Sequence, residues 1–517
     1  MIRSASSPAV TSRPVGVALP RAAAAAGAAL LAFAAALLVR MIFIDRSWDV
    51  FIDELTYLTI SSNLLNGSGL SEFGRPFFLH PPVYFALEAA YMRLFVPAGD
   101  LLTQLHLVRD LNAVLGAASA ALIFQLVRRV AGWRAGAIAA VLFALDPFVI
   151  RNNSRNLLDT AAMFFVLAGY AVLLDGLDVR PPSFLRAVAS GLLFGAAVLT
   201  KDMTAMLTVA PIGVLAITGW LLPRRKAAVV VCLIAATYAT YVLGVAASGH
   251  WGDLVSQKFV GLTRFAGFLK ETGFRSGGPS FIQAIVTNLD MFAATYVLFA
   301  LGVAVLPLVM LHRDKRYRIV ALWTLSAYAV IGFSVAVGTL EEQFFYFLIA
   351  PVIVTLGLGC QRLLDQAARG HLALAAQLIR PILLAFVIWS SAVWLEVHLI
   401  PDDGYARLGT YLNEHVSRSS LVGVVSDPHL TSSALLVSEL NPRYRVEPVS
   451  TADDVCRTTA EYIVVSSKQV ESGYVPDGPH LYSWIVGAGN RTFSFSGRSF
   501  GRLELYRIDP QVCRAPR

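Results

Sequence analysis

The chain has 517 residues, of which 56% are hydrophobic and 15% are charged, and its mean hydropathy is +0.62. This charged fraction is far below the roughly 25% of an average soluble domain, which excludes a soluble globular protein and indicates a membrane protein with several spans. The formal charge of +8 comes from short basic clusters between apolar runs. Because no basic run is interleaved with aromatic residues, we interpret these clusters as topology determinants and not as a nucleic-acid surface.

The first 21 residues are polar, basic and interrupted by prolines, which is typical of a cytoplasmic tail. The apolar run that follows, from Ala22 to Ile44, is longer than the about 7 to 15 residues of a signal-peptide core. No small-residue cleavage site precedes Asp45. We therefore expect this run to be a retained transmembrane helix.

Apolar runs of this kind recur along the chain, and a helix needs about 20 such residues to cross the hydrocarbon core. They cover residues 22–44, 104–127, 134–150, 158–175, 184–200, 203–221, 227–247, 292–311, 319–337, 345–363 and 380–399. The predicted fold class is therefore mainly α, a polytopic bundle of about eleven transmembrane helices over residues 22–400.

The segment from Pro82 to Pro97 is apolar but short, and it contains Glu88 and Arg93. Each charge would cost about 2.5 to 3.5 kcal/mol at the centre of a spanning helix, so we interpret the segment as an interfacial helix. With the N-terminus inside, all four basic clusters then fall on the cytoplasmic side, as the positive-inside rule requires. These clusters lie at residues 128–134, 180–186, 224–226 and 312–318.

The first exported loop, residues 45–103, carries two adjacent acids, Asp53 and Glu54, directly after the first span. A carboxylate at the outer membrane surface can act as a general base toward a hydroxyl, or can help to bind a divalent cation. The simpler interpretation is that both acids only solvate the loop. The loop also carries Arg75, and His80 before two prolines, where a structural turn residue is the simpler interpretation.

Another polar segment on the exported side surrounds the start of an apolar helix at Asp159. An acid at this position is favoured by the helix dipole, so a capping role is one interpretation. Arg155 lies four residues earlier. It can pair with Asp159 or bind a phosphate with its planar guanidinium.

Two polar turns are expected on the same side. Lys201 and Asp202 interrupt an otherwise apolar hairpin, and Glu341, Glu342 and Gln343 separate two later spans. A tight turn between spans needs polar residues, which is a sufficient explanation for both. Their shared membrane face with Asp53 is what makes them candidates for a site.

Residues 401–517 have a soluble composition, and we expect a small exported α/β domain. The segment GYARLGTYLNEHV predicts an amphipathic helix, LVGVVS and EYIVVSS predict buried strands, and TFSFSG with RLELYRI predicts a terminal strand pair. Cys456 and Cys513 both lie in this domain. An oxidising compartment would favour a disulfide between them, and two free thiols are the alternative.

The segments FIDELTY, LHPPVYF, RNLLDTAAMFF and AVLTKDM, in this order and on one face, resemble the GT-C glycosyltransferases. Among these enzymes, the chain is most similar to the dolichyl-phosphate-mannose protein mannosyltransferases and the aminoarabinose transferases. Together these form the glycosyltransferase family 39-like group. It covers residues 1–220 well and the remainder only by layout. Leu79 and His80 stand where the aminoarabinose transferases carry an acid and a lysine, which moves the likeness toward the mannosyltransferases.

This resemblance implies an inverting transfer of a sugar from a polyprenyl-phosphate donor to a hydroxyl of a lipid, glycan or protein acceptor. The reaction would occur on the exported face of a bacterial plasma membrane, with no nucleic-acid partner. Asp53 would be the base, and Glu54 and Asp159 would assist it; a divalent metal held by Asp53 and Asp159 is the only cofactor considered. The donor phosphate would be bound by Arg155, Lys201, His80 and Arg75, and substrates would contact Tyr57, Glu341, Glu342 and Gln343.

Two alternatives remain open. A transporter or flippase of lipid-linked sugars would predict paired charges in mid-membrane and an inverted repeat of broken helices, whereas here the charges cluster at the ends of spans. The second alternative is a catalytically inactive relative whose exported domain acts as a binding module. The sequence has no P-loop, no dinucleotide-binding fingerprint, no HExxH and no GxSxG, which argues against an ATP-driven machine.

Overall fold

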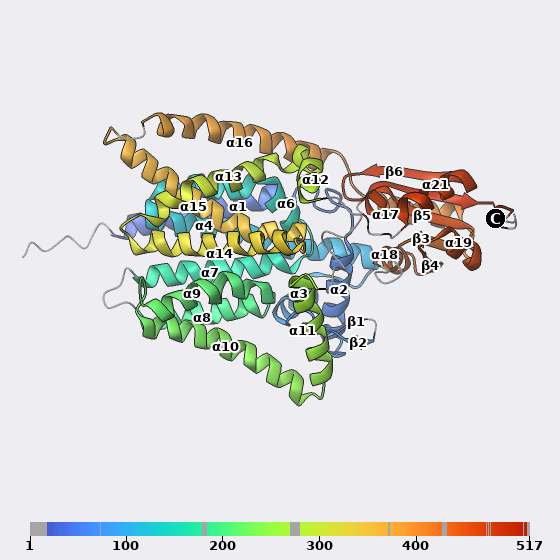
Figure 1. The fold of residues 1–517 in the computed structure, drawn as a ribbon, viewed down its shortest axis with the longest axis horizontal. Coiled ribbons are helices and arrows are strands. Elements are labelled where there is room, and N and C mark those ends of the chain that lie inside the picture. The colour runs from blue at the N-terminus through green and yellow to red at the C-terminus, as the bar shows by residue number, and fades with distance from the viewer. Residues whose placement is uncertain are drawn as a thin grey trace, which may run out of the picture.

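The computed structural model describes the chain except for residues 1–17, 73, 178–182, 269–279, 371–372, 427–431, 472, 474, 476, 510 and 514–517. The expected cytoplasmic tail therefore lies almost entirely outside the described residues. Figure 1 shows a long helical bundle with a smaller, sheet-containing domain at one end. The predicted fold class, mainly α with a small C-terminal α/β domain, is confirmed.

Every one of the apolar runs forms a helix, but not all of these helices reach spanning length. In the described residues, eight are long and apolar enough to cross a membrane, or nine if a bent pair counts as one span. The eight are α1 (Ala18–Met41), α4 (Leu101–Ala131), α7 (Leu158–Leu177), α10 (Arg224–Ala247), α13 (Leu289–Met310), α14 (Lys315–Val337), α15 (Phe345–Ala367) and α16 (Ala373–Leu399).

The remaining three runs are bent or short. The run at 134–150 forms α5 (Trp133–Leu145) and α6 (Pro147–Asn153), which meet at 63°. Pro147 has no N–H to donate and disfavours a helical conformation at Asp146. Asp146 instead caps α6 by accepting a hydrogen bond from Val149 N at 2.9 Å. The runs at 184–200 and 203–221 form α8 (Phe184–Val198) and α9 (Ala205–Thr218), separated by the short helix η2 (Asp202–Thr204).

Short elements gather at the end of the bundle next to the sheet domain (Figure 1). They are α2 (Ile52–Leu65), β1 (Ser71–Glu72), β2 (Arg75–Pro76), α3 (Val83–Phe95), α11 (Trp251–Phe265), α12 (Phe281–Thr287) and η3 (Glu342–Phe344). The expected interfacial helix is α3, which has 13 residues. Its buried Glu88 accepts hydrogen bonds from Ser61 Oγ at 2.9 Å and Asn156 Nδ2 at 2.6 Å, so α3 packs on α2 through polar contacts.

The C-terminal domain is a five-stranded sheet in the order β4-β3-β5-β7-β6. The strands are β3 (Leu421–Val425), β4 (Arg445–Val449), β5 (Tyr462–Ser466), β6 (Gly489–Gly497) and β7 (Gly501–Ile508), and β4, β3 and β5 are parallel. As predicted, two buried runs form β3 and β5 and the terminal strands pair antiparallel. The helices are α17 (Gly404–His415), α18 (Ser432–Leu440), α19 (Ala452–Thr458), α20 (Ser467–Glu471) and α21 (Gly478–Ala488).

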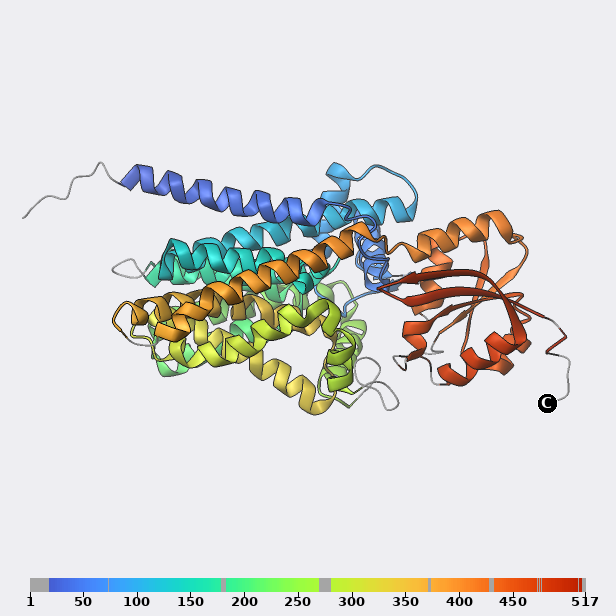
Figure 2. The same cartoon turned by 90° about the horizontal axis from the view of Figure 1, so that it is seen from above.

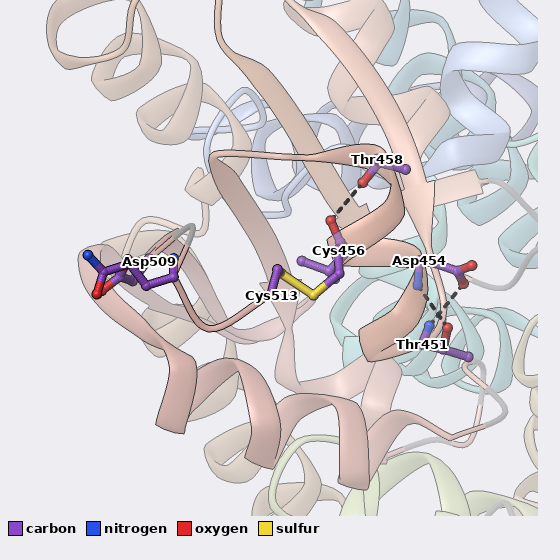
Figure 3. The surroundings of a disulfide bond; sticks show 8 residues. Thr451, Asp454, Cys456, Thr458, Asp509 and Cys513 are labelled. Atoms are coloured by element: carbon purple, nitrogen blue, oxygen red, sulfur yellow. Dashed lines mark hydrogen bonds between the residues drawn. A yellow bond between two sulfur atoms is a disulfide. The ribbon is translucent and has the colours of Figure 1, made fainter. Parts of the chain in front are cut away.

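A disulfide joins Cys456 on α19 to Cys513 near the end of the chain (Figure 3). The two Cα atoms are 5.3 Å apart, within the range that a disulfide requires. It closes a sequence separation of 57 residues and ties Cys513 to α19.

The sheet domain is docked firmly on the bundle (Figure 2). One hydrophobic cluster contains Leu55 and Leu58 of α2 together with Leu408 of α17 and Leu503 of β7. Arg498, in the turn between β6 and β7, donates hydrogen bonds to the carbonyls of Ser47, Val397 and Ile400 at 2.7, 2.9 and 2.6 Å. This shared hydrophobic core and these hydrogen bonds therefore hold the sheet domain against one end of the bundle.

Candidate active site

Charged side chains from four separate segments meet beside the first turn of α2. Asp53 lies there, and the charges of Glu341, Lys201, Asp159 and Arg264 all act on its carboxyl group. The structure thus brings together four of the sequence-predicted residues, and it adds Arg264.

The helix α2 presents Asp53 and Tyr57 on one face because residues four apart are neighbours on a helix surface. Burial, with the negative charge of Glu341, raises the pKa of Asp53 to about 7, and Lys201 acts in the opposite direction. Among the described residues no hydrogen bond or ion pair is recorded for the Asp53 carboxylate. It is therefore a carboxylate that can take up a proton near neutral pH.

A buried ion pair lies next to Asp53. Lys201 Nζ is 2.7 Å from Asp159 Oδ1, and the two side chains are 7% and 0% exposed. Asp159 lies in the first turn of α7, and Lys201 precedes η2 in the break between α8 and α9. The second oxygen of Asp159 is buried and has no hydrogen-bond partner in the part of the chain that the structure describes.

Tyr57 and His80 form an aromatic wall of the site. The His80 ring lies edge-on to Tyr57, with ring centres 6.0 Å apart, and the Phe77 ring centre is also 6.0 Å from that of His80. Burial and the neighbouring cations Lys201, Lys258 and Arg264 lower the pKa of His80 well below its usual value. His80 is therefore a neutral imidazole, and the expectation that it supplies a positive charge for a phosphate does not fit this environment.

The helix α11 contributes two cations that the sequence-based hypothesis missed. Lys258 Nζ is 2.6 Å from Asp202 Oδ2 and 3.0 Å from the carbonyl oxygen of Leu79. Arg264 Nη2 is 3.3 Å from Glu341 Oε1. The available signal was the amphipathic pattern of residues 251–265, with basic residues on the polar side. That pattern does not show that the helix returns to the loop around His80.

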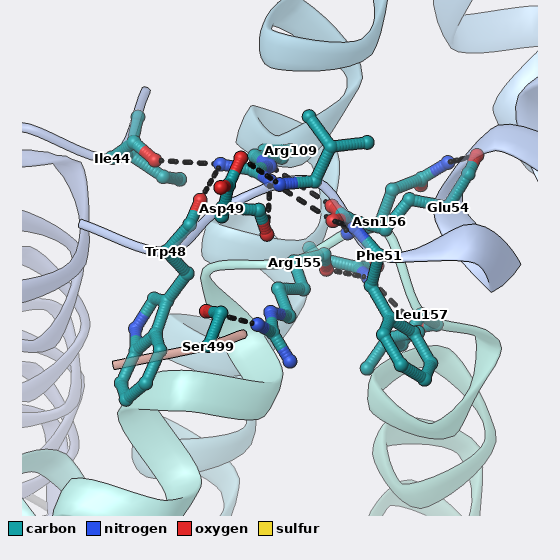
Figure 4. A network of polar contacts seen from close by, with 12 residues as sticks. Ile44, Trp48, Asp49, Phe51, Glu54, Arg109, Arg155, Asn156, Leu157 and Ser499 are labelled. Carbon is teal, nitrogen blue, oxygen red and sulfur yellow. Dashed lines mark hydrogen bonds and ion pairs between the residues drawn. The ribbon is translucent and has the colours of Figure 1, made fainter. Parts of the chain in front are cut away.

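Glu54 differs from its neighbour Asp53 and points into the protein (Figure 4). Its two oxygens lie 2.9 Å from Nε and Nη2 of Arg109, and both side chains are completely buried. It also accepts hydrogen bonds from the backbone N–H groups of Phe51 and Asn156 at 3.0 and 2.8 Å. Because every lone pair is occupied by the protein, the expectation that Glu54 assists catalysis is replaced by a structural role at the start of α2.

Two of the expected phosphate ligands lie elsewhere. Arg75 is an exposed residue of β2. Arg155 is 3% exposed, and its guanidinium lies over the rings of Trp48 and Phe51 and donates to Ser499 Oγ at 2.9 Å (Figure 4). It therefore faces the C-terminal domain and does not pair with Asp159.

The side chains of the polar turn before α15 face two different parts of the protein. Glu341 faces the Asp53 site through Arg264, and Gln343 donates to the other oxygen of Glu341. Glu342 instead lies 2.7 Å from Nη1 of Arg151 on α6. The turn thus links the Asp53 site to the surface under the sheet domain.

The donor atoms around Asp53 do not fit a divalent metal well. The described residues contain no group of three or more His, Cys, Asp or Glu side chains arranged to hold an ion. One oxygen of Asp159 is already in contact with the Lys201 ammonium, which neutralises the charge that a metal would need. The side chains around Asp53 therefore favour lysine and arginine, and not a metal ion, as the source of positive charge at this site.

Comparison with known proteins gives one family match. The sequence model of the dolichyl-phosphate-mannose-protein mannosyltransferases matches residues 102–247, which is less than half of the chain. This region begins in α4, ends in α10 and includes Asp159 and Lys201. No curated protein sequence matches significantly.

Solved structures match over almost the whole chain. The archaeal oligosaccharyltransferase AglB from Archaeoglobus fulgidus, in complex with an inhibitory peptide and a dolichol-phosphate, superposes with a TM-score of 0.61 at 12% identity, covering 95% of this chain and 75% of that one. ArnT from Cupriavidus metallidurans superposes with TM-scores of 0.58 in the apo state and 0.54 bound to undecaprenyl phosphate. The identities are 16% and 14%, and the two matches cover 96% and 97% of this chain and all of the other. At these identities the similarity shows the fold.

Proposed function

We propose that this chain, which has the fold of the GT-C glycosyltransferases and matches part of the protein mannosyltransferase family, is a glycosyltransferase that uses a polyprenyl-phosphate-linked sugar. The observation that carries the proposal is the Asp53 carboxylate, with a pKa of about 7 and with the charges of Lys201 and Arg264 acting on it, while Lys258 acts on the nearby His80. A transfer between a lipid phosphate and a hydroxyl needs one base and positive charge for the leaving group, and no further acid.

In the proposed reaction, Asp53 accepts the proton of an acceptor hydroxyl while the hydroxyl oxygen attacks the anomeric carbon of the sugar. The bond between that carbon and the phosphate oxygen breaks, and the polyprenyl phosphate leaves as an anion. A single displacement of this kind inverts the anomeric configuration. Tyr57 and His80 lie beside Asp53 and would contact the sugar.

Lys201, Lys258 and Arg264 would bind the leaving phosphate. Each is held by one carboxylate, Asp159, Asp202 and Glu341 respectively, so their charges are fixed before the donor binds. Charge that is already in position costs no reorganisation during the reaction, which is why such groups contribute most to catalysis. The role in donor binding thus passes from Arg75 and Arg155 to the two cations of α11.

The site would face the outside of a bacterial plasma membrane. Basic clusters occupy the opposite end of the bundle, where Arg129 pairs with Asp175 and Arg316 pairs with Asp314. A site next to the membrane surface allows the prenyl chain to stay in the hydrocarbon. The positive-inside rule supports this orientation.

The proposal is tested with purified full-length protein in lipid nanodiscs, a radiolabelled polyprenyl-phosphate sugar and candidate acceptors. We expect transfer by the wild-type protein, loss of transfer in Asp53→Asn, and an inverted anomeric configuration by NMR of the product. Asp253→Asn, which removes an exposed carboxylate on α11, is the matched control and should keep wild-type activity. Wild-type activity in Asp53→Asn would refute the assignment of the base.

A further inference from the structure

The helix α11 exposes an apolar stripe along its length. Four of its large exposed side chains recur every three or four residues, and residues with this spacing are neighbours on a helix surface. They are Trp251, Val255, Phe259 and Leu262, which are 54%, 45%, 64% and 64% exposed. We call these four residues the α11 stripe. The described part of the chain leaves the stripe open to its surroundings.

The rest of the free surface of α11 is mainly polar. Consecutive residues of a helix point about 100° apart, so the α11 stripe occupies a sector of about 80°, and Asp253, Ser256 and Thr263 occupy a neighbouring sector of about 80°. Val260, which is 37% exposed, is the apolar residue of that second sector. A free surface divided lengthwise into an apolar and a polar half is typical of a helix that lies in the plane of a membrane surface.

The position of α11 in the chain places it beside the lipid. The preceding helix α10 is long and apolar enough to span, and only 17% of its apolar window is buried inside the protein. Leu243, in the last turns of α10, is 67% exposed, so this lipid-facing surface extends almost to the end of the span. The helix α10 ends at Ala247, and α11 begins at Trp251. Figure 1 shows that α11 then runs across the end of the bundle and does not continue along α10.

The inner side of α11 holds the loop that leads to His80. Gln257 accepts a hydrogen bond from Phe78 N at 2.6 Å and donates one to the carbonyl of Pro76 at 2.8 Å. Lys258 Nζ donates to the carbonyl of Leu79 at 3.0 Å. The helix thus turns hydrogen-bonding side chains toward the protein and an apolar stripe outward. A surface helix of a water-soluble protein has the reverse arrangement.

We propose that the α11 stripe lies in the headgroup and upper acyl-chain layer of the leaflet next to the candidate site, so that the partner of α11 is the lipid surface. An apolar stripe gains free energy when this layer covers it, and the gain fixes the depth and rotation of the helix. Trp251 suits this level of the membrane because a tryptophan ring is apolar and its N–H group is polar.

Resting on the proposed transferase function, this lipid contact positions two cations of the candidate site. Lys258 Nζ is 2.6 Å from Asp202 Oδ2, and Arg264 Nη2 is 3.3 Å from Glu341 Oε1. Both cations belong to α11, so a change in its depth or rotation moves both of them. The bilayer therefore acts on the site through α11, and it is the same bilayer that holds the prenyl chain of the proposed donor.

The first test locates the stripe without any transfer reaction. The free cysteines Cys232 and Cys360 are replaced by serine, which keeps the disulfide. Single cysteines are then introduced and spin-labelled in full-length protein in phosphatidylcholine nanodiscs. Electron paramagnetic resonance measures collisions of each label with dissolved oxygen, which concentrates in lipid, and with a water-soluble nickel chelate.

The labels should divide as the two sectors of α11 do. Labels at Val255→Cys and Phe259→Cys should collide more with oxygen than with nickel, as should a label at Leu243→Cys in the span α10. A label at Ser256→Cys, on the polar sector, is the matched control and should show the opposite preference. A preference for nickel at Phe259→Cys would place the stripe in water and overturn the proposal. Few collisions with either reagent would show that protein covers the stripe, from this chain or a second copy, and would also overturn it.

The positioning of the cations has its own readout. Phe259→Glu places a charge in the stripe and should lower kcat/KM for the donor about tenfold, as the loss of one charge-assisted hydrogen bond to the phosphate would give. Phe259→Leu keeps the stripe apolar, and Ser256→Glu places the same charge on the polar sector, so both should retain wild-type activity. Wild-type kcat/KM in Phe259→Glu would refute the positioning role. If the labels lie in lipid but the wild-type protein transfers no sugar, the membrane contact stands and the transferase function fails.

Discussion

Replacing Lys201 by methionine separates the structural from the chemical contribution of the buried pair with Asp159. Both side chains are almost fully buried and the nitrogen lies 2.7 Å from the carboxylate oxygen. The variant Lys201→Met would leave a buried carboxylate with no ammonium beside it, and the other oxygen already lacks a partner. Removing one member of a buried ion pair costs about 3 to 5 kcal/mol, so we expect a strong loss of stability.

The double variant Lys201→Met, Asp159→Asn removes both charges and should recover most of that stability. Activity should not return, because the cation that we propose to stabilise the leaving phosphate is absent from both variants. Loss of one such preorganised group lowers kcat by about 100- to 1,000-fold. Unfolding in detergent and kcat/KM in nanodiscs are measured for both variants, with Lys315→Met, an exposed lysine at the opposite end of the bundle, as control.

The outcome discriminates between two roles of Lys201. If the double variant regains both stability and activity, Lys201 serves only to neutralise Asp159, and its place in the proposed reaction is refuted. If Lys201→Met is as stable as the wild-type protein, the reasoning from burial is wrong.

Three further predictions follow from the same geometry. Because Asp53 must be deprotonated to act as the proposed base and its pKa is raised to about 7, kcat/KM should fall about tenfold per pH unit below 7. The free energy of unfolding should also fall as the pH rises from about 4 through 7, because the folded protein holds the Asp53 proton more tightly than the unfolded chain does, and Asp53→Asn should remove this loss. The variant Glu54→Gln should lower stability by about 3 to 5 kcal/mol because it leaves Arg109 buried without its partner; a normal unfolding curve with an altered pH profile would instead indicate a catalytic role. Reduction, or Cys456→Ser, should destabilise the C-terminal sheet domain by about 2 to 5 kcal/mol, as expected for a native disulfide, and leave the melting of the helical bundle unchanged.

The sequence was sufficient for the features that depend on local composition. Apolar runs form helices wherever they occur, because their composition makes burial in hydrocarbon favourable. The orientation inferred from the basic clusters stays a prediction. Alternating and buried apolar patterns in residues 401–517 likewise predicted the strands β3, β5, β6 and β7. The number of spans was predicted less well, since α8 and α9 are shorter than a span and Pro147 bends its helix.

Only the tertiary structure shows that the adjacent carboxylates of Asp53 and Glu54 have different surroundings. Consecutive residues on a helix point about 100° apart, so one carboxylate faces the site while the next faces Arg109 in the interior. Nothing in the sequence around Glu54 indicates Arg109, which lies 55 positions away. The ion-pair partner of a buried charge depends on how segments far apart in the sequence pack together. Amino-acid composition does not reveal which residue that partner is.

The same reason explains where the predicted cations lie. The sequence predicted that Lys201, Arg155 and the basic residues of α11 lie on one membrane face. Only the fold decided that Arg264 approaches Asp53 and that Lys258 contacts the loop at Leu79 and His80, while Arg155 turns toward Trp48 and the sheet domain. Topology places a residue on a face of the membrane, but a site needs contacts of a few ångströms, and those depend on how helices far apart in sequence pack together.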